Sequence, residues 1–258
     1  MQAIVLKRAD FREFDQIISV YTKERGKLEA LARGVKKITS KNAAHLEPFC
    51  FAMIEIAPGR ELDHLTKVVP LDLFVNIRRD LNKSLVVGYM VSFLGKMVEV
   101  EEADIRMWEL TLGWLKFVNE LENLEDRDRL VTLIDGYIIN LFGFLGFAPV
   151  LEKCVVCGKE YQEIAKEQIL TNKKLGFYFS GGGLICANCI LEKTKIGEEI
   201  LVCGLKEIND MQLLMKGDWR LMVSFEMSAT EQKRLHGLVY EFVIYHSEEQ
   251  LRDWANIL

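Results

Sequence analysis

Four cysteines carry the clearest chemical signal in this sequence. They form two C-x-x-C pairs, Cys154 with Cys157 and Cys186 with Cys189, separated by 28 residues. Two such pairs present four thiolates at a spacing that suits tetrahedral Zn²⁺, and the residues between them can form a hairpin or loop that folds one pair onto the other. Gly158 follows the first pair and permits a positive φ, so that backbone N–H groups can point at sulfur. The spacing therefore predicts one zinc ion per chain, bound by these four thiolates.

The predicted zinc ion is structural, because four sulfur ligands leave no open position for water or substrate. Two alternatives stay open: a redox pair, or four reduced cysteines without a metal. A thioredoxin-like redox motif needs a βαβ context, which the surrounding sequence lacks. The two remaining cysteines, Cys50 and Cys203, are expected to be ordinary buried thiols.

Disulfide bonds are a less suitable explanation for the cysteines, since they are typical of secreted domains. The start of the chain shows no apolar run behind a basic segment, and no segment reaches the roughly 18 apolar residues of a membrane span. We therefore expect a cytoplasmic protein, associated with the nucleoid if it binds DNA.

Signals for catalysis are weak elsewhere in the chain. The histidines do not pair at metal-ligand or catalytic spacing and are expected to be surface or half-buried residues: His45, His64, His236 and His246. The motifs G-x-x-x-x-G-K-[ST], G-x-G-x-x-G and G-x-S-x-G do not occur. The glycines at 181–183 are better explained by a tight turn beside the second cysteine pair than by phosphate binding. We expect no enzyme, and an unrecognised catalytic site is the least favoured class of function.

Charge is distributed unevenly along the chain. The formal net charge is −5, yet residues 1–41 contain ten Lys and Arg against five acids. Residues 99–128 contain ten acids against three basic residues, at positions that suit a solvated helix face. This asymmetry predicts a basic binding face on an otherwise acidic protein.

The basic face is predicted to bind nucleic acid. Cations that surround a groove can each neutralise a phosphate and release a counterion, which gives salt-sensitive binding without sequence preference. The candidate DNA contacts are Arg33, Lys36, Lys37 and Lys41, with Arg8 and Lys27 as flanking candidates. Aromatic residues accompany them, and some of these can stack on bases: Phe11, Phe14, Tyr21, Phe49 and Phe51. The alternatives are a solvated charge run for the lysines and barrel core for the aromatics, above all Phe49 and Phe51.

Short strands are expected to come first in the chain and helices later. Five apolar segments separated by turn sequences predict strands at 3–8, 16–22, 27–34, 49–57 and 63–69, a number that suits a small closed barrel. Apolar residues at helical spacing predict helices at 81–100, 107–121 and 129–146, and a helical pattern over 231–258. The fold class is therefore α+β: a barrel at 1–75, a helical domain at 76–150 and 193–258, and an inserted zinc module at 151–192.

Several sequence motifs together resemble one known family. They are the segment from 1 to 40 with its acidic pair Glu13 and Asp15, LEPF at 46–49, LGFAPVLEKCVVCG ending at Gly158, and F-x-F-x-x-GGLIC ending at Cys186. In this order they resemble RecO, a family of bacterial recombination mediators and DNA-repair proteins. The resemblance extends over most of the chain.

The resemblance implies a fold and a function. RecO proteins typically combine an OB-fold, a helical domain and a zinc-binding module. The implied function is binding of single- and double-stranded DNA, annealing of complementary strands, and action with RecR and single-stranded DNA-binding protein to load RecA. The competing hypothesis is a protein–protein adaptor, in which the zinc module and the acidic helices do the binding and the basic barrel is incidental. DNA binding measured over a salt series discriminates between the two.

Overall fold

The computed structural model describes residues 1–37, 40, 43–122, 127–224, 226–247 and 250–257. The chain forms two compact units, one spanning 1–124 with 257–258 and the other spanning 125–256. No helix in the described part of the chain has the length and apolar character that crossing a lipid bilayer requires. The domain boundaries expected at residues 75, 150 and 192 stay a prediction.

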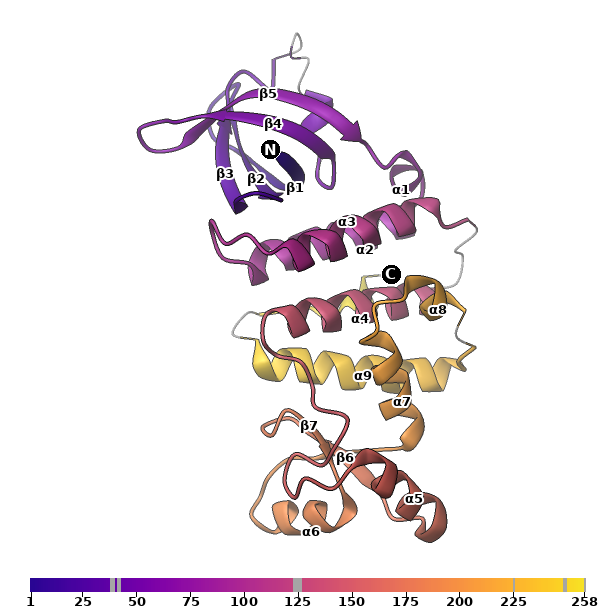
Figure 1. Cartoon of the computed structure of the whole chain (residues 1–258). Coiled ribbons are helices and arrows are strands. Elements are labelled where there is room, and N and C mark those ends of the chain that lie inside the picture. The colour runs from indigo at the N-terminus through magenta and orange to yellow at the C-terminus, as the bar shows by residue number, and fades with distance from the viewer. Residues whose placement is uncertain (38–39, 41–42, 123–126, 225, 248–249, 258) are drawn as a thin grey trace. The chain divides into compact units, whose positions relative to one another are not determined.

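Five strands close into a barrel in the first unit (Figure 1). Their order around the barrel is β1-β2-β3-β5-β4, with β3 and β5 parallel and the other neighbours antiparallel. Apolar side chains at every second position, such as Ala3 and Val5 or Ile18 and Val20, fill the interior. The closed five-strand barrel confirms the predicted OB-like fold. The strands are β1 (Gln2–Asp10), β2 (Gln16–Thr22), β3 (Gly26–Ala32), β4 (Phe51–Ala57) and β5 (Asp63–Asp72), with a 3₁₀ turn at Ala43–Leu46.

Three helices complete the first unit: α1 (Val75–Arg79), α2 (Leu81–Met97) and α3 (Ile105–Glu120). The side chain of Asp80 caps α2 by accepting a hydrogen bond from the N–H of Lys83. Helix α2 packs on β1, and Trp108 of α3 lies against the rings of Tyr21 and Phe51. The sequence pattern placed the end of α2 at residue 100, whereas the helix ends earlier because Val100 forms a β-bridge with Lys27.

The second unit contains the remaining predicted helices. Helices α4 (Arg127–Phe144) and α9 (Ala229–His246) pack on each other, and α7 (Leu205–Leu214) and α8 (Trp219–Val223) pack on α4. The helical pattern extended to residue 258, but α9 ends at His246. Within the described residues the chain then turns back into a 3₁₀ turn at Trp254–Asn256, which buries the indole ring of Trp254 completely.

The cysteine segment forms a small module with its own sheet. Its strands β6 (Leu175–Tyr178), β7 (Gly183–Ile185) and β8 (Leu201–Cys203) are arranged in the order β7-β6-β8, and helices α5 (Tyr161–Thr171) and α6 (Ala187–Lys195) flank the hairpin in the chain. Gly182 has φ of +73°, and its N–H donates to the carbonyl of Phe179 at 2.9 Å. This confirms the tight turn expected at the glycines. The sequence pattern did not predict α5.

Candidate metal centre and nucleic-acid interface

The four cysteines predicted to bind zinc lie together. One sulfur atom from each of Cys154, Cys157, Cys186 and Cys189 lies within 4.8 Å of the other three. The first pair sits in the turn before α5, where Gly158 adopts φ of +74° as expected and donates its N–H to the carbonyl of Cys154. In the second pair, Cys186 precedes α6 and Cys189 lies in its first turn. The β6–β7 hairpin thus connects the two pairs, as the spacing predicted.

Backbone donors make the cluster suitable for thiolates. Burial opposes ionisation of the Cys154 thiol, but backbone N–H groups of Cys157, Cys186 and Val156 outweigh it and lower the pKa of Cys154 to about 7. The N–H of Cys186 lies 3.4 Å from the Cys154 sulfur. Burial raises the pKa of Cys186. Since adjacent thiolates repel one another, ionisation of all four requires a cation at their centre, and four sulfurs in this arrangement are compatible with Zn²⁺.

The remaining cysteines lie outside the cluster. Cys50 is fully buried in the barrel, as expected, and Cys203 is half-buried at the end of β8. Burial raises the pKa of Cys203 to about 12, so its thiol is neutral at physiological pH.

A second candidate site lies at one end of the barrel. A hollow of about 270 Å³ opens between the β1–β2 loop, the end of β3 and the β4–β5 loop. A second hollow, of about 430 Å³, opens between the β1–β2 loop and the residues that follow β3. Both hollows are lined by Arg12 and Arg33. We call this surface the barrel-end face, and define it by Phe11, Arg12, Phe14, Arg33, Lys36, Lys37, Arg60 and His64.

Main-chain hydrogen bonds hold the β1–β2 loop in place. The N–H of Phe11 donates to the carbonyl of Asp15 at 3.1 Å, and the N–H of Asp15 donates to the carbonyl of Arg12 at 3.3 Å. The N–H of Lys36 donates to the carbonyl of Phe14 at 3.1 Å, which joins this loop to the segment after β3. The loop therefore has a defined shape.

Cations outnumber acids on the barrel-end face. Lys36 donates to the Asp10 carboxylate at 2.7 Å, and hydrogen bonds from Gln16 and Lys36 lower the pKa of Asp10. Within the described part of the chain, the other four cations of the face have no ion pair with a carboxylate: Arg12, Arg33, Lys37 and Arg60. Three acids, Glu13, Asp15 and Glu61, line the hollows, against four cations. The face therefore attracts anions.

The structure brings together three of the six predicted DNA contacts, Arg33, Lys36 and Lys37. Arg8 instead forms a 2.7 Å ion pair with Glu47. The ammonium group of Lys27 donates to the carbonyl of Gly95 at 2.6 Å, at the end of α2. Lys41 lies outside the described residues.

Arg12 and Arg60 were not among the predicted contacts. Both lie in loops between strands, and the loops of OB-folds between strands 1 and 2 and between strands 4 and 5 commonly bind oligonucleotides. The strand prediction placed Arg12 and Arg60 between strands, so loop position was the signal that identifies them.

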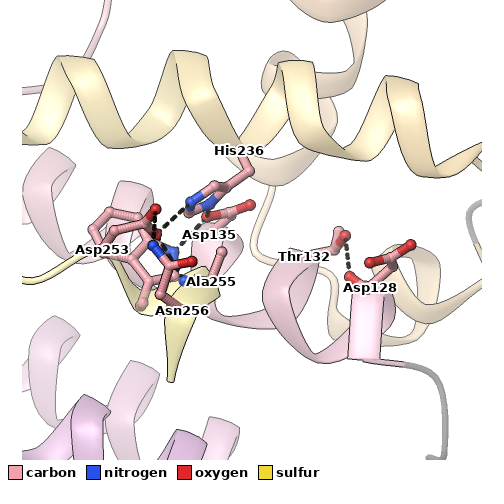
Figure 2. A network of polar contacts seen from close by, with 8 residues as sticks. Asp128, Thr132, Asp135, His236, Asp253, Ala255 and Asn256 are labelled. Carbon is pink, nitrogen blue, oxygen red and sulfur yellow. Dashed lines mark hydrogen bonds and ion pairs between the residues drawn. The ribbon is translucent and has the colours of Figure 1, made fainter. Parts of the chain in front are cut away.

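A buried polar network lies in the second unit. His236 of α9 sits between two carboxylates: its Nδ1 is 2.9 Å from Asp135 Oδ1 and its Nε2 is 2.9 Å from Asp253 Oδ1 (Figure 2). The indole N–H of Trp254 donates to the same Asp135 oxygen at 2.7 Å. His236 is only 6% exposed, so the expectation of a surface or half-buried residue was wrong for it. The sequence pattern gave no sign of this network, because its members are far apart in the chain.

The network opposes a catalytic role for His236. Burial alone lowers the pKa of the imidazole, but hydrogen bonds to Asp135 and Asp253 outweigh burial and raise the pKa to about 9. Both ring nitrogens thus donate to carboxylates, and neither is left to act as a general base. The network holds the segment around Trp254 against α4 and α9.

The fold and these sites define a class of protein: an OB-like barrel with a cationic loop end, joined in one chain to helices and a four-cysteine cluster. Residues 1–74 match the family model described as "Recombination protein O N terminal", and residues 78–255 match "Recombination protein O C terminal". The chain therefore belongs to the RecO family of DNA repair proteins, which confirms the resemblance found in the sequence.

Similar curated proteins are named as members of the same family, and the similarity covers about two thirds or more of each. The "DNA repair protein RecO" of Desulforamulus reducens is 27% identical over 252 residues, which cover 98% of this chain and 91% of the relative. The protein of the same name from Syntrophomonas wolfei is 31% identical over 188 residues, which cover 73% of this chain and 68% of the relative. The protein of the same name from Thermoanaerobacter sp. is 29% identical over 261 residues, which cover 100% of this chain and 96% of the relative.

Proposed function

We propose that this protein is a DNA-binding recombination mediator that anneals complementary strands. With RecR, it would help load RecA onto single strands coated by single-stranded DNA-binding protein. The observation that carries the proposal is the barrel-end face, where Arg12, Arg33 and Lys37 stand without carboxylate partners among the described residues of an acidic chain. Membership of a DNA-repair family supports DNA as the ligand. This action on the chromosome agrees with the expected cytoplasmic, nucleoid-associated location.

Annealing needs no nucleophile. Lysine and arginine side chains that contact phosphates lower the repulsion between two strands, and binding of both strands to one protein raises their effective concentration. A cationic face accelerates pairing in this way without nucleotide hydrolysis. We therefore propose a non-enzymatic mechanism.

The four-cysteine cluster is proposed to hold one structural zinc ion. Its sulfur atoms lie within 4.8 Å of one another, and a four-sulfur set leaves no open coordination position. The ion would stabilise the module that connects α4 with the final helices of the chain, and DNA chemistry would not pass through it.

A strand-pairing assay tests the proposed function. Two complementary oligonucleotides labelled for energy transfer are coated with single-stranded DNA-binding protein and mixed with this protein in EDTA, without ATP. We expect faster pairing that declines as salt rises, because phosphate contacts are screened. Consumption of ATP without faster pairing would reveal an enzyme and overturn the proposal.

The adaptor remains the second candidate function, because one surface suits a protein partner. A groove of about 480 Å³ lies beside β8 and α9, lined by Leu201, Val202 and Leu238 among others. Val202 is 50% exposed there. Absence of both DNA binding and faster pairing, at low and high salt, would favour this function.

A further inference from the structure

Two phenylalanine rings stand exposed on the barrel-end face. Phe11 is 44% exposed and Phe14 is 43% exposed, whereas Phe49, Phe51 and Phe74 of the same unit are buried. Burial of Phe49 and Phe51 confirms their expected place in the protein interior. Since exposure of a large apolar ring to water is unfavourable, two such rings in one short, hydrogen-bonded loop indicate a surface for binding.

Each exposed ring has a cation beside it. The guanidinium carbon of Arg12 lies 5.0 Å from the centroid of Phe11, and the ammonium nitrogen of Lys37 lies 5.6 Å from the centroid of Phe14. Both distances are within the range of a cation–π interaction, which limits the freedom of ring and cation. Each pair thus presents an apolar ring and a positive charge within the same few ångströms.

The two rings line neighbouring hollows. Phe11 lines the hollow of about 270 Å³ and Phe14 lines that of about 430 Å³, and Arg12 and Arg33 line both. Two aromatic positions with cations between them match the repeating chemistry of a nucleic-acid strand, in which planar bases alternate with phosphates.

We propose that Phe11 and Phe14 are stacking platforms for unpaired bases, and that they give the barrel-end face its selectivity for single strands. This inference rests on the proposed DNA-binding function. An unpaired base offers a π-face to an aromatic ring, whereas the bases of a duplex are already stacked on one another. Phosphate contacts alone do not make this distinction.

The selectivity has a consequence for annealing. Strands that enter as single strands are held by stacking and by phosphate contacts. Once they pair, their bases leave the rings and only the phosphate contacts remain. The product duplex is therefore released more readily than its component strands, which lets one protein act repeatedly.

The test compares three ligands on the full chain. The Phe11→Ala/Phe14→Ala variant and the unchanged protein are titrated by fluorescence polarisation with a thymidine 30-mer, a duplex of equal length and an abasic 30-mer. We expect single-strand affinity to fall about tenfold or more, because each stacked base contributes substantially to binding. Duplex and abasic affinities should stay within about twofold, and the salt slope for the single strand should not change, since no phosphate contact is lost.

Two further variants separate stacking from loop structure. Phe11→Leu/Phe14→Leu keeps apolar bulk without a π-face and should show the same single-strand defect. Phe147→Ala removes a ring that is also 43% exposed but lies in the second unit, and should bind like the unchanged protein.

The outcomes distinguish this inference from the function on which it rests. No DNA binding by the unchanged protein overturns the proposed function itself. Normal single-strand affinity in the leucine variant, or an equal loss on all three ligands, overturns the stacking role while DNA binding stands.

Discussion

The carboxylate of Asp15 accepts a hydrogen bond from the backbone N–H of Gly34 at 2.8 Å. This contact ties the loop that carries Phe11 and Phe14 to the segment that carries Arg33 and Lys37. Gly34 has φ of +63°, a conformation that favours glycine. Together with the hydrogen bond from the Lys36 N–H to the Phe14 carbonyl, this contact positions the loop that carries the two phenylalanines against the segment that carries Arg33 and Lys37.

Asp15→Ala is expected to weaken DNA binding several-fold even though it removes an acid. Loss of the contact loosens the attachment of the loop to the segment after β3, although its main-chain hydrogen bonds remain. Ordering the binding groups on DNA then costs part of the affinity. Barrel stability should fall by only about 1 kcal/mol, the typical contribution of one hydrogen bond. Fluorescence polarisation and urea unfolding measure the two effects. Glu13→Ala is the matched control, since Glu13 is an exposed acid of the same loop, and should strengthen binding slightly. Stronger binding by both variants would contradict the positioning role.

Exchange of Lys36 and Lys37 for glutamate tests the phosphate contacts. The double variant should bind single strands roughly tenfold or more weakly, about equally for unrelated sequences, because phosphates carry no base information. The slope of log affinity against log salt should fall by about 1.4, that is, about 0.7 for each lost contact. Titrations at four salt concentrations measure it.

Lys173 and Lys174 provide the control for this charge reversal. They are an adjacent, exposed lysine pair in the second unit. Replacement of both by glutamate changes the net charge by the same amount. The slope of log affinity against log salt should stay equal, within error, to that of the unchanged protein. If both double variants reduce the slope equally, binding follows overall charge rather than the barrel-end face.

The barrel was predictable because its signals are local. Alternating apolar residues and turn sequences identify strands without knowledge of their partners. The end of α2 was not predictable in this way, because Val100 leaves the helix to pair with Lys27, a residue far away in sequence. The apolar period continues through Val100 and contains no sign of that bridge.

The cysteine cluster was predictable for a similar reason, since ligand spacing is itself local information. The cations of the barrel-end face were only partly predictable from the sequence. Clustering in sequence identified Arg33, Lys36 and Lys37, but it equally selected Lys27, whose ammonium group donates to the carbonyl of Gly95. Side-chain direction depends on tertiary packing, which charge counting does not contain. For the same reason the sequence did not predict the contacts of His236, whose hydrogen-bond partners are Asp135 and Asp253.

Cys186→Ser tests the proposed zinc ion. A structural site contributes folding free energy, so loss of one ligand should lower the unfolding temperature by at least about 5 °C and reduce bound zinc from about one ion per chain to near zero. Elemental analysis and differential scanning calorimetry measure these effects. The Cys203→Ser variant is the control, because Cys203 lies outside the cluster, and it should still contain about one zinc ion per chain. Four freely titratable thiols and no zinc in the unchanged folded protein would contradict the site.

The charge on His236 predicts an alkaline loss of stability. Its pKa is about 9 in the folded chain, against an ordinary value of 6.5. A raised folded-state pKa means that the stabilising contribution is fully present below about pH 6.5 and is lost as pH rises through about 9. Tyr240 stacks on the imidazole, and burial raises its pKa further above 10.0, so it stays neutral over most of this range.

The His236→Gln variant should therefore be less stable than the unchanged protein at pH 7, because Asp135 loses its cationic partner. Its free energy of unfolding should also decline less steeply between pH 6.5 and 9.5. Urea unfolding followed by intrinsic fluorescence measures both, since Trp254 lies in the network. His246→Gln is the control: burial lowers the pKa of His246, so that residue is already neutral in this range, and its variant should keep the decline of the unchanged protein. A stability profile of the His236→Gln variant that runs parallel to that of the unchanged protein would show that His236 is not charged in the folded chain.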